Sequence, residues 1–87
     1  MSGQFEYRTI SMYLESWYRM NEAYTDYVAV LGDGSRVEGV EMLLRRYLDD
    51  GGWSLVTITP TGFSLRSGTS TGHVVDTLMV IFRRQLL

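Results

Sequence analysis

The sequence predicts a small α+β domain, with a mostly antiparallel sheet of three to four strands and one main helix packed on one face. One stretch, 36–49, places apolar residues at helical spacing. The segments 5–14, 53–60 and 73–84 are rich in the aromatic and β-branched residues that favour strands. A chain of 87 residues allows one modest core, so we expect a single domain over 1–87.

The first strand is expected at 5–14, FEYRTISMYL, and the segment that follows is ambiguous. The stretch YTDYVAVL predicts a second strand at about 25–31, paired with the first through a loop around RMNEA. Apolar residues in the same region also fit a helical stripe, so a helix over 14–24 is the alternative.

The main helix is expected at 36–49. Ser35 followed by Glu38 fits a capping box, in which the hydroxyl and the carboxylate each satisfy a backbone N–H at the helix start. The apolar residues that follow share one helical face: Val37, Val40, Leu44, Tyr47 and Leu48. Gly51 and Gly52 permit the left-handed backbone angles that end a helix, so we expect Trp53 to enter the core at this corner.

The last two strands are expected at 53–60, which the only proline ends, and at 73–84. Between them, 61–72 (TGFSLRSGTSTG) is rich in Gly, Ser and Thr and predicts a long flexible loop. A right-handed crossover through the helix would set strand 53–60 parallel to strand 5–14, with the last strand returning antiparallel between them.

The expected strands are apolar on both faces. In the first strand the alternation places Phe5, Tyr7 and Thr9 together; in the last it separates Val75, Met79 and Ile81 from Val74, Leu78, Val80 and Phe82. One helix covers one face, so either the 14–31 segment or another copy of the chain must cover the second. Burying about 600 Å² of apolar surface contributes about 15 kcal/mol before entropic costs, so we expect a homo-oligomer formed through a sheet face.

Composition excludes several classes of function. A net charge of −2 argues against a general binder of nucleic-acid backbones. All eight basic residues are arginine, which excludes Schiff-base and phosphate-loop lysines. The chain has no cysteine and one histidine, His73, so we expect no metal site, no cofactor and no catalytic residues. The composition therefore favours a protein that is not an enzyme, and it leaves a minimal enzyme open.

The longest apolar run, LMVIF at 78–82, is far too short to span a bilayer, and the N-terminus has no signal-peptide pattern. We therefore expect no membrane partner and a cytoplasmic location.

Three segments together resemble a family of short bacterial proteins, the domain-of-unknown-function family 4177. The residues that match are Phe5, Glu6, Tyr7 and Arg8 at the start; Leu43, Leu44, Leu48, Gly52, Trp53, Leu55 and Val56 at the corner; and Phe82 and Arg83 at the end. Ser54 stands where the family usually has glutamate, and 15–34 look like an insertion. The resemblance covers about half of the chain and implies a small strand–helix–strand–strand fold with no established activity.

Two groups of residues are candidates for ligand binding. The first lies in the 61–72 loop, where backbone N–H groups and an arginine can hold a phosphate or carboxylate: Arg66, Ser67 and Thr69. The second would form an arginine–aromatic pocket at an oligomer interface, suited to a nucleotide or another small anion: Arg8, Arg83 and Arg84, with Tyr7 and Trp17.

The preferred interpretation is a small non-enzymatic, homo-oligomeric binding or interaction module whose biological role the sequence leaves open. Its expected partners are itself and a small anionic ligand or nucleotide. The alternative is a sponge or inhibitor, made by a phage or mobile element, that sequesters such a ligand at a subunit interface. A minimal enzyme with an active site at that interface ranks last.

Overall fold

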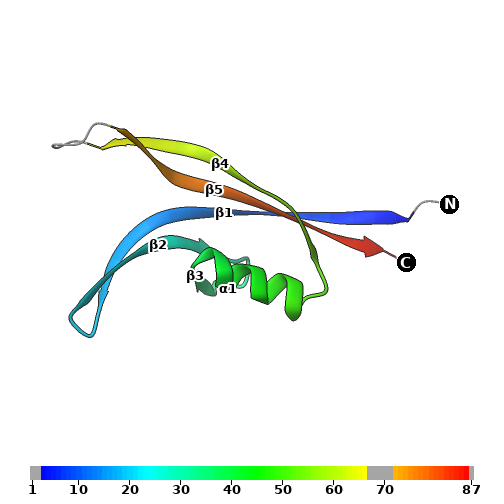
Figure 1. Ribbon diagram of the computed structural model, residues 1–87. Coiled ribbons are helices and arrows are strands. Elements are labelled where there is room, and N and C mark those ends of the chain that lie inside the picture. The colour runs from blue at the N-terminus through cyan, green and yellow to red at the C-terminus, as the bar shows by residue number, and fades with distance from the viewer. Residues whose placement is uncertain (1–2, 67–71, 87) are drawn as a thin grey trace.

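The computed structural model describes residues 3–66 and 72–86, and most of them belong to one antiparallel β-sheet (Figure 1). The sheet has the strand order β3-β2-β1-β5-β4. Its strands are β1 (Gln4–Arg19), β2 (Glu22–Val30), β3 (Arg36–Glu38), β4 (Ser54–Arg66) and β5 (Gly72–Leu86). Between β3 and β4, the helix α1 (Val40–Leu44) continues directly into a π-helical stretch, η1 (Arg45–Asp49).

The expected α+β fold class is wrong, because the protein is mostly β. The sheet has five strands rather than three or four, and the helical segment consists of two stretches of 5 residues each. β1 continues to Arg19 and β4 to Arg66, beyond their expected ends. These extensions contain polar residues at exposed sheet positions, and a pattern of apolar residues does not detect them. In the part of the chain that the structure describes, no helix has the length and apolarity that crossing a membrane requires.

β1 and β2 form a tight hairpin, which confirms the expected second strand and shows that a helix over 14–24 is wrong. Arg19 pairs with Glu22, so only Met20 and Asn21 lie in the turn. Both have positive φ angles, 52° and 66°, as in a type I′ turn, whose twist matches that of the flanking strands. The residues between β1 and β3 therefore extend the sheet sideways instead of covering one of its faces.

The helix begins later than expected, and the capping box at Ser35 and Glu38 is wrong. Ser35 donates hydrogen bonds from its N–H and its Oγ to the Asp33 carboxylate, and Glu38 lies in β3. Gly39, with a φ of 96°, separates β3 from α1, and its N–H donates to the carbonyl of Tyr27 in β2. Pairing with β2 thus replaces the first turn of the expected helix.

The corner between η1 and β4 has the expected form. Gly52 has a φ of 71°, and the Trp53 N–H donates to the Tyr47 carbonyl over 2.9 Å. The Trp53 side chain is buried and packs edge-on against Tyr47, which stacks on Phe82 with 4.5 Å between ring centroids. These three rings attach η1 to the sheet.

β5 lies between β1 and β4 and is antiparallel to both, so β1 and β4 run parallel to each other, as expected. The prediction of a flexible loop at 61–72 is wrong at both ends of that segment, because β4 continues to Arg66 and β5 begins at Gly72. The remaining residues of that segment, 67–71, lie outside the described residues.

The hydrophobic core lies between the helical segment and one face of the sheet (Figure 1). Its buried side chains are Met12, Ala29, Val37, Leu43, Tyr47, Trp53, Val80 and Phe82, with Leu78 packed against them. The even-numbered face of β5 therefore faces the helix, and the alternation in the sequence grouped these β5 residues correctly.

Candidate functional site

The sheet face opposite α1 and η1 carries a continuous set of apolar and hydroxyl side chains. Cross-strand pairs on this face are Tyr7–Arg83, Thr9–Ile81 and Ser11–Met79 between β1 and β5, and Phe63–Val75 between β4 and β5. We call this surface the open face, and define it by Phe5, Tyr7, Thr9, Ser11, Tyr13, Phe63, Val75, Met79 and Ile81. The sequence pattern placed Phe5, Tyr7 and Thr9 on one face of the first strand, and Val75, Met79 and Ile81 on one face of the last. The structure places these two groups side by side.

Four aromatic rings of the open face are exposed to solvent: Phe5 by 41%, Tyr7 by 59%, Tyr13 by 55% and Phe63 by 60%. The aliphatic side chains between them are half-buried by their neighbours. Arg83 lies at one end of the face, where its guanidinium is 4.6 Å from the centroid of the Phe5 ring. Several exposed aromatic rings on one face of a sheet often mark a contact with another molecule.

A second group of side chains surrounds Trp53, where η1 meets the end of the sheet. The guanidinium carbons of Arg8 and Arg84 lie 5.1 Å and 4.5 Å from the centroid of the Trp53 ring. Arg84 also donates from Nε to Glu6 Oε1 over 3.0 Å. Within residues 3–66 and 72–86, Arg8 has no carboxylate partner. We call this group, formed by Glu6, Arg8, Trp53 and Arg84, the arginine–tryptophan cluster.

Within a single chain, the residues of the arginine–aromatic pocket predicted at an oligomer interface do not all lie together. Arg8 and Arg84 meet on Trp53, on the helix side of the sheet, whereas Arg83 projects from the open face. Trp17 lies further along β1 than Arg8, by roughly 30 Å of strand at about 3.3 Å per residue. There it stacks on Tyr24, and the Arg36 guanidinium lies 5.1 Å from its ring centroid.

The other predicted ligand-binding group consists of Arg66, Ser67 and Thr69. Arg66 is the last residue of β4, and Ser67 and Thr69 lie outside the described residues.

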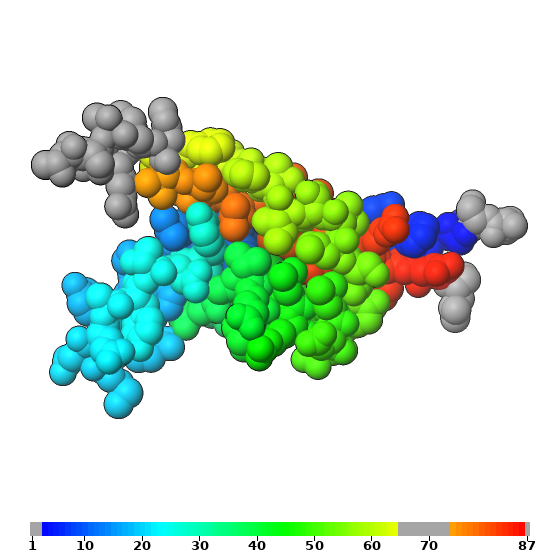
Figure 2. All heavy atoms as spheres, in the orientation of Figure 1, coloured from blue at the N-terminus to red at the C-terminus, as the bar shows by residue number. Residues whose placement is uncertain are grey.

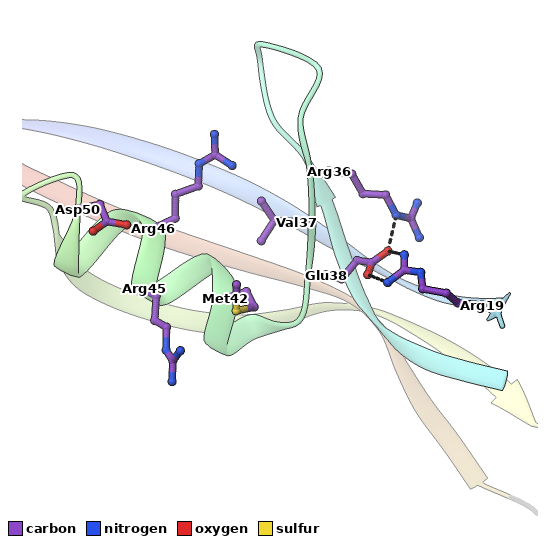
Figure 3. Close-up of a pocket in the computed structure, with 8 residues that line it drawn as sticks. All are labelled: Arg19, Arg36, Val37, Glu38, Met42, Arg45, Arg46 and Asp50. Atoms are coloured by element: carbon purple, nitrogen blue, oxygen red, sulfur yellow. Dashed lines mark hydrogen bonds and ion pairs between the residues drawn. The ribbon is translucent and has the colours of Figure 1, made fainter. Parts of the chain in front are cut away.

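A hollow of about 770 Å³ lies beside the outer edge of β3, between the sheet and the helical segment (Figure 3). Its lining residues are Arg19, Arg36, Val37, Glu38, Met42, Arg45, Arg46 and Asp50. Each lining arginine is ion-paired: Arg19 and Arg36 with Glu38, Arg45 with Glu41, and Arg46 with Asp33. Because these carboxylates compensate the guanidinium groups, the hollow offers an anion little unbalanced positive charge.

Glu38 is the centre of this ion-pair network. Its carboxylate accepts hydrogen bonds from Arg19 at 3.1 and 3.0 Å and from the Arg36 Nε at 3.0 Å. The hydrogen bonds from Arg19, and then those from Arg36, hold the pKa of Glu38 below its ordinary value. The hydrogen bond to Glu38 is also the main cause that raises the pKa of Arg36. The network therefore ties the end of β1 to β3 across β2.

Metal-ligating side chains do not gather in the ranges that the structure describes, where no three His, Cys, Asp or Glu residues are placed to hold an ion. No protein-family model matches the sequence, and neither a curated protein nor a solved structure matches the chain. The resemblance to family 4177 therefore stays a prediction, and the candidate sites are the open face and the arginine–tryptophan cluster.

Proposed function

We propose that this chain is a non-enzymatic, self-associating interaction module, and that a second copy of the chain covers the open face. The observation that carries the proposal is the exposure of four aromatic rings on a face that no element of the described chain covers: Phe5, Tyr7, Tyr13 and Phe63. An antiparallel sheet can leave one face to water, but that face is then mostly polar, whereas this one carries exposed rings. The helical segment, α1 with η1, lies on the other face.

The position of the 14–31 segment supports a second copy as the cover. The sequence analysis gave two sources of cover, this segment and another copy of the chain. The segment forms the end of β1 and all of β2, which continue the sheet sideways and so do not lie over the open face.

The chemistry of the open face suits contact with an identical face. Aromatic side chains bury a large area with few rotatable bonds, and a tyrosine hydroxyl can keep a hydrogen bond at the rim of an interface. The nine residues that define the face carry no charge, and the one charged group at its end, Arg83, lies over the Phe5 ring. Full burial of one such side chain is worth about 1.5–3 kcal/mol, and less here because each ring is already partly covered.

The substitution Tyr7→Glu tests the proposal. Tyr7 is exposed, and a glutamate at this position would lie beside its cross-strand partner Arg83, so the single chain should tolerate it. A carboxylate buried between two faces has a large desolvation cost. We therefore expect sedimentation velocity to show a smaller particle for the variant than for the wild type at equal concentration.

The matched control is Tyr18→Glu, on the same strand but on the opposite face, where the tyrosine is 82% exposed. This control should sediment like the wild type. Equal sedimentation of wild type and Tyr7→Glu would contradict the proposal.

The arginine–tryptophan cluster favours a second candidate function, the binding of a small anion. Two guanidinium groups lie over one indole, and a single carboxylate, Glu6, accompanies them. Arg8 can therefore offer its fork of N–H donors to a phosphate or carboxylate.

Thermal unfolding in inorganic phosphate, and separately in a nucleoside monophosphate, tests this second candidate. We expect either anion to raise the Tm of the wild type and to leave the Tm of Arg8→Gln unchanged, while the control Arg45→Gln behaves like the wild type. A wild-type Tm that neither anion raises would remove this candidate. The cytoplasmic location also stays a prediction, which cell fractionation would check.

A further inference from the structure

The sheet divides at Tyr13 into two hairpins that point in different directions (Figure 1). The pairing of β1 with β5 ends at Tyr13–Thr77, and β1 pairs with β2 from Tyr13 onward. Beyond this point β1 continues with β2, and β5 continues with β4. We call residues 14–27 the first arm, and residues 62–66 with 72–76 the second arm.

The first arm has few buried contacts with the rest of the molecule. Every residue from Tyr18 to Asp26 is exposed, and in Figure 2 the atoms near the tip of this arm (cyan) project away from those of β5 (orange). On the side of β3, ion pairs of Arg19 and Glu15 hold the arm. An element with so few buried contacts is easily displaced, so the contacts on its other side decide its direction.

On the side of β5, one hydrogen bond links the two arms. The Tyr27 hydroxyl donates to the Val75 carbonyl over 2.6 Å, so a side chain of β2 reaches across β1 to β5. Among the side chains that the structure describes, no other hydrogen bond or ion pair joins the first arm to the second. The bond is part-buried, and the Tyr27 ring packs against the hydrophobic core.

The position of this bond gives the hydroxyl a definite task. Val75 lies beyond the last pair of β1 with β5, Tyr13–Thr77, so the tyrosine hydroxyl is the donor to its carbonyl on a stretch that β1 has left. A part-buried carbonyl that loses its donor is costly, which favours the one arrangement that keeps the bond. We infer that the Tyr27 hydroxyl is a latch that fixes the angle between the two arms, and that its removal lets the first arm move about Tyr13.

The latch also sets the shape of the surface opposite the helical segment. Trp17 follows Tyr13 on the same face of β1 and lies opposite Tyr24 of β2, whereas Phe63 belongs to the second arm. The angle between the arms therefore fixes how far these two groups of aromatic rings lie apart. The inference concerns the single chain and does not depend on a second copy.

Electron paramagnetic resonance distances between two spin labels test the inference. The chain has no cysteine, so labels attach only at introduced positions. Ala23→Cys places one label on an exposed position of the first arm, and Thr61→Cys places the other on an exposed position of β4. Labelled chains are diluted into excess unlabelled wild type, so that each distance is measured within one chain.

We expect a narrow distance distribution for the labelled wild-type background. Tyr27→Phe keeps the ring and removes the hydroxyl, and it should give a broader distribution that extends to longer distances. The matched control is Tyr24→Phe, which removes a hydroxyl that donates to Glu22 within β2 and should keep the narrow distribution. Equal distributions for the two variants, or a broad distribution before either substitution, would overturn the inference.

Hydrogen–deuterium exchange separates movement of the arm from loss of the fold. The peptide that contains Leu78–Phe82 should exchange equally in wild type and Tyr27→Phe, because this part of β5 lies outside both arms. Faster exchange there would show that the hydroxyl supports the core instead of the angle, and would also overturn the inference. The same distances are expected in chains that carry Tyr7→Glu, so the latch and the open-face contact can fail separately.

Discussion

Single residues decide where the chain turns between its helical segment and its sheet. Gly52 has a φ of 71°, in the left-handed region that residues with a Cβ rarely adopt. This angle directs the chain so that Trp53 reaches the core, where it contacts Tyr47. The glycine is therefore required for its backbone angle, since a Cβ built on it would contact nothing within 4 Å.

Gly52→Ala should lower the free energy of unfolding by about 1–2 kcal/mol, from backbone strain alone. Gly32→Ala is the matched control, because Gly32 has open space around its Cβ position and no positive φ angle. Urea denaturation of both variants checks this. A similar loss of stability in both would contradict the assignment of the effect to the φ angle of Gly52.

Glu38 gives the protein a predictable response to acid. The pKa of its carboxyl group is lowered in the folded chain from an ordinary value of 4.5, mainly by the hydrogen bonds from Arg19. The unfolded chain then binds more protons near this pH, so the stabilisation is present above pH 4.5 and is lost as the pH falls through the lowered pKa.

Glu38→Gln should therefore flatten the dependence of Tm on pH between about pH 5 and about pH 3, and lower the Tm at neutral pH. Glu41→Gln is the control, since it removes an exposed carboxylate that is paired with Arg45 alone. Parallel curves of Tm against pH for wild type and Glu38→Gln would contradict a stabilising role for the ionised Glu38 carboxylate.

At the scale of elements, the β1–β2 hairpin depends on a two-residue turn that its sequence does not favour. A type I′ turn prefers Asn-Gly or Asp-Gly, and the chain has Met20 and Asn21. Met20 is 92% exposed, so a substitution there removes few contacts. The turn thus forms because the flanking strands pair, from Tyr13–Val28 to Arg19–Glu22.

Met20→Asn should raise the free energy of unfolding by about 0.5–1 kcal/mol, because asparagine tolerates the left-handed region better than methionine. Met20→Ala, which gains no such preference, should show no increase. Chemical denaturation would detect the difference, and equal stabilities for the two variants would argue against a type I′ turn.

The helical segment is held on the sheet by stacked rings, and Phe82 is the fully buried one. Phe82→Ala should cost about 3–5 kcal/mol, because it leaves a cavity beneath Tyr47. Leu86→Ala, at an exposed position of the same strand, should cost far less. If chemical denaturation showed similar losses of stability for Phe82→Ala and Leu86→Ala, Phe82 would not be part of the core.

Sequence patterns predicted those elements whose signal is local. The corner at Trp53 and the alternating faces of β5 have such signals, since glycines and apolar residues at fixed spacing mark them. The start of the helix was misjudged because Ser35 and Glu38 have the spacing of a capping box, while their actual partners are Asp33, Arg19 and Arg36. Residues 36–38 form a strand because they pair with β2, and no local sequence pattern indicates that pairing.

The candidate site was predicted in part for the same reason. Alternation grouped the open-face residues of β1 (Phe5, Tyr7, Thr9) and of β5 (Val75, Met79, Ile81), whereas Phe63 lay in an expected loop. The register that places Tyr7 beside Arg83 depends on contacts between the two ends of the chain. Within one chain, Arg83 and Arg84 do not lie together, because they are adjacent on a strand and so project from opposite faces. The stacking of Arg8 on Trp53 joins residues far apart in the sequence and had no local signal.

At the largest scale, the molecule is long and thin, with extents of 57 × 31 × 18 Å. β1 contributes to this shape because its first part pairs with β5 and its last part with β2. One short helical segment covers the middle of one face, and the opposite face is left with exposed aromatic rings. A single chain of this shape leaves the aromatic rings of its open face exposed, and this is why we propose that a second copy covers them.

Hydroxyl-radical footprinting of the wild-type protein at micromolar concentration tests that claim most directly. Tyr7 and Tyr13 are 59% and 55% exposed in the single chain, and Tyr18, on the other face of β1, is 82% exposed. If a second copy covers the open face, Tyr7 and Tyr13 will be oxidised far more slowly than Tyr18, and dilution will remove their protection. Oxidation of all three at rates that follow their exposure in the single chain, at every concentration, would contradict the account.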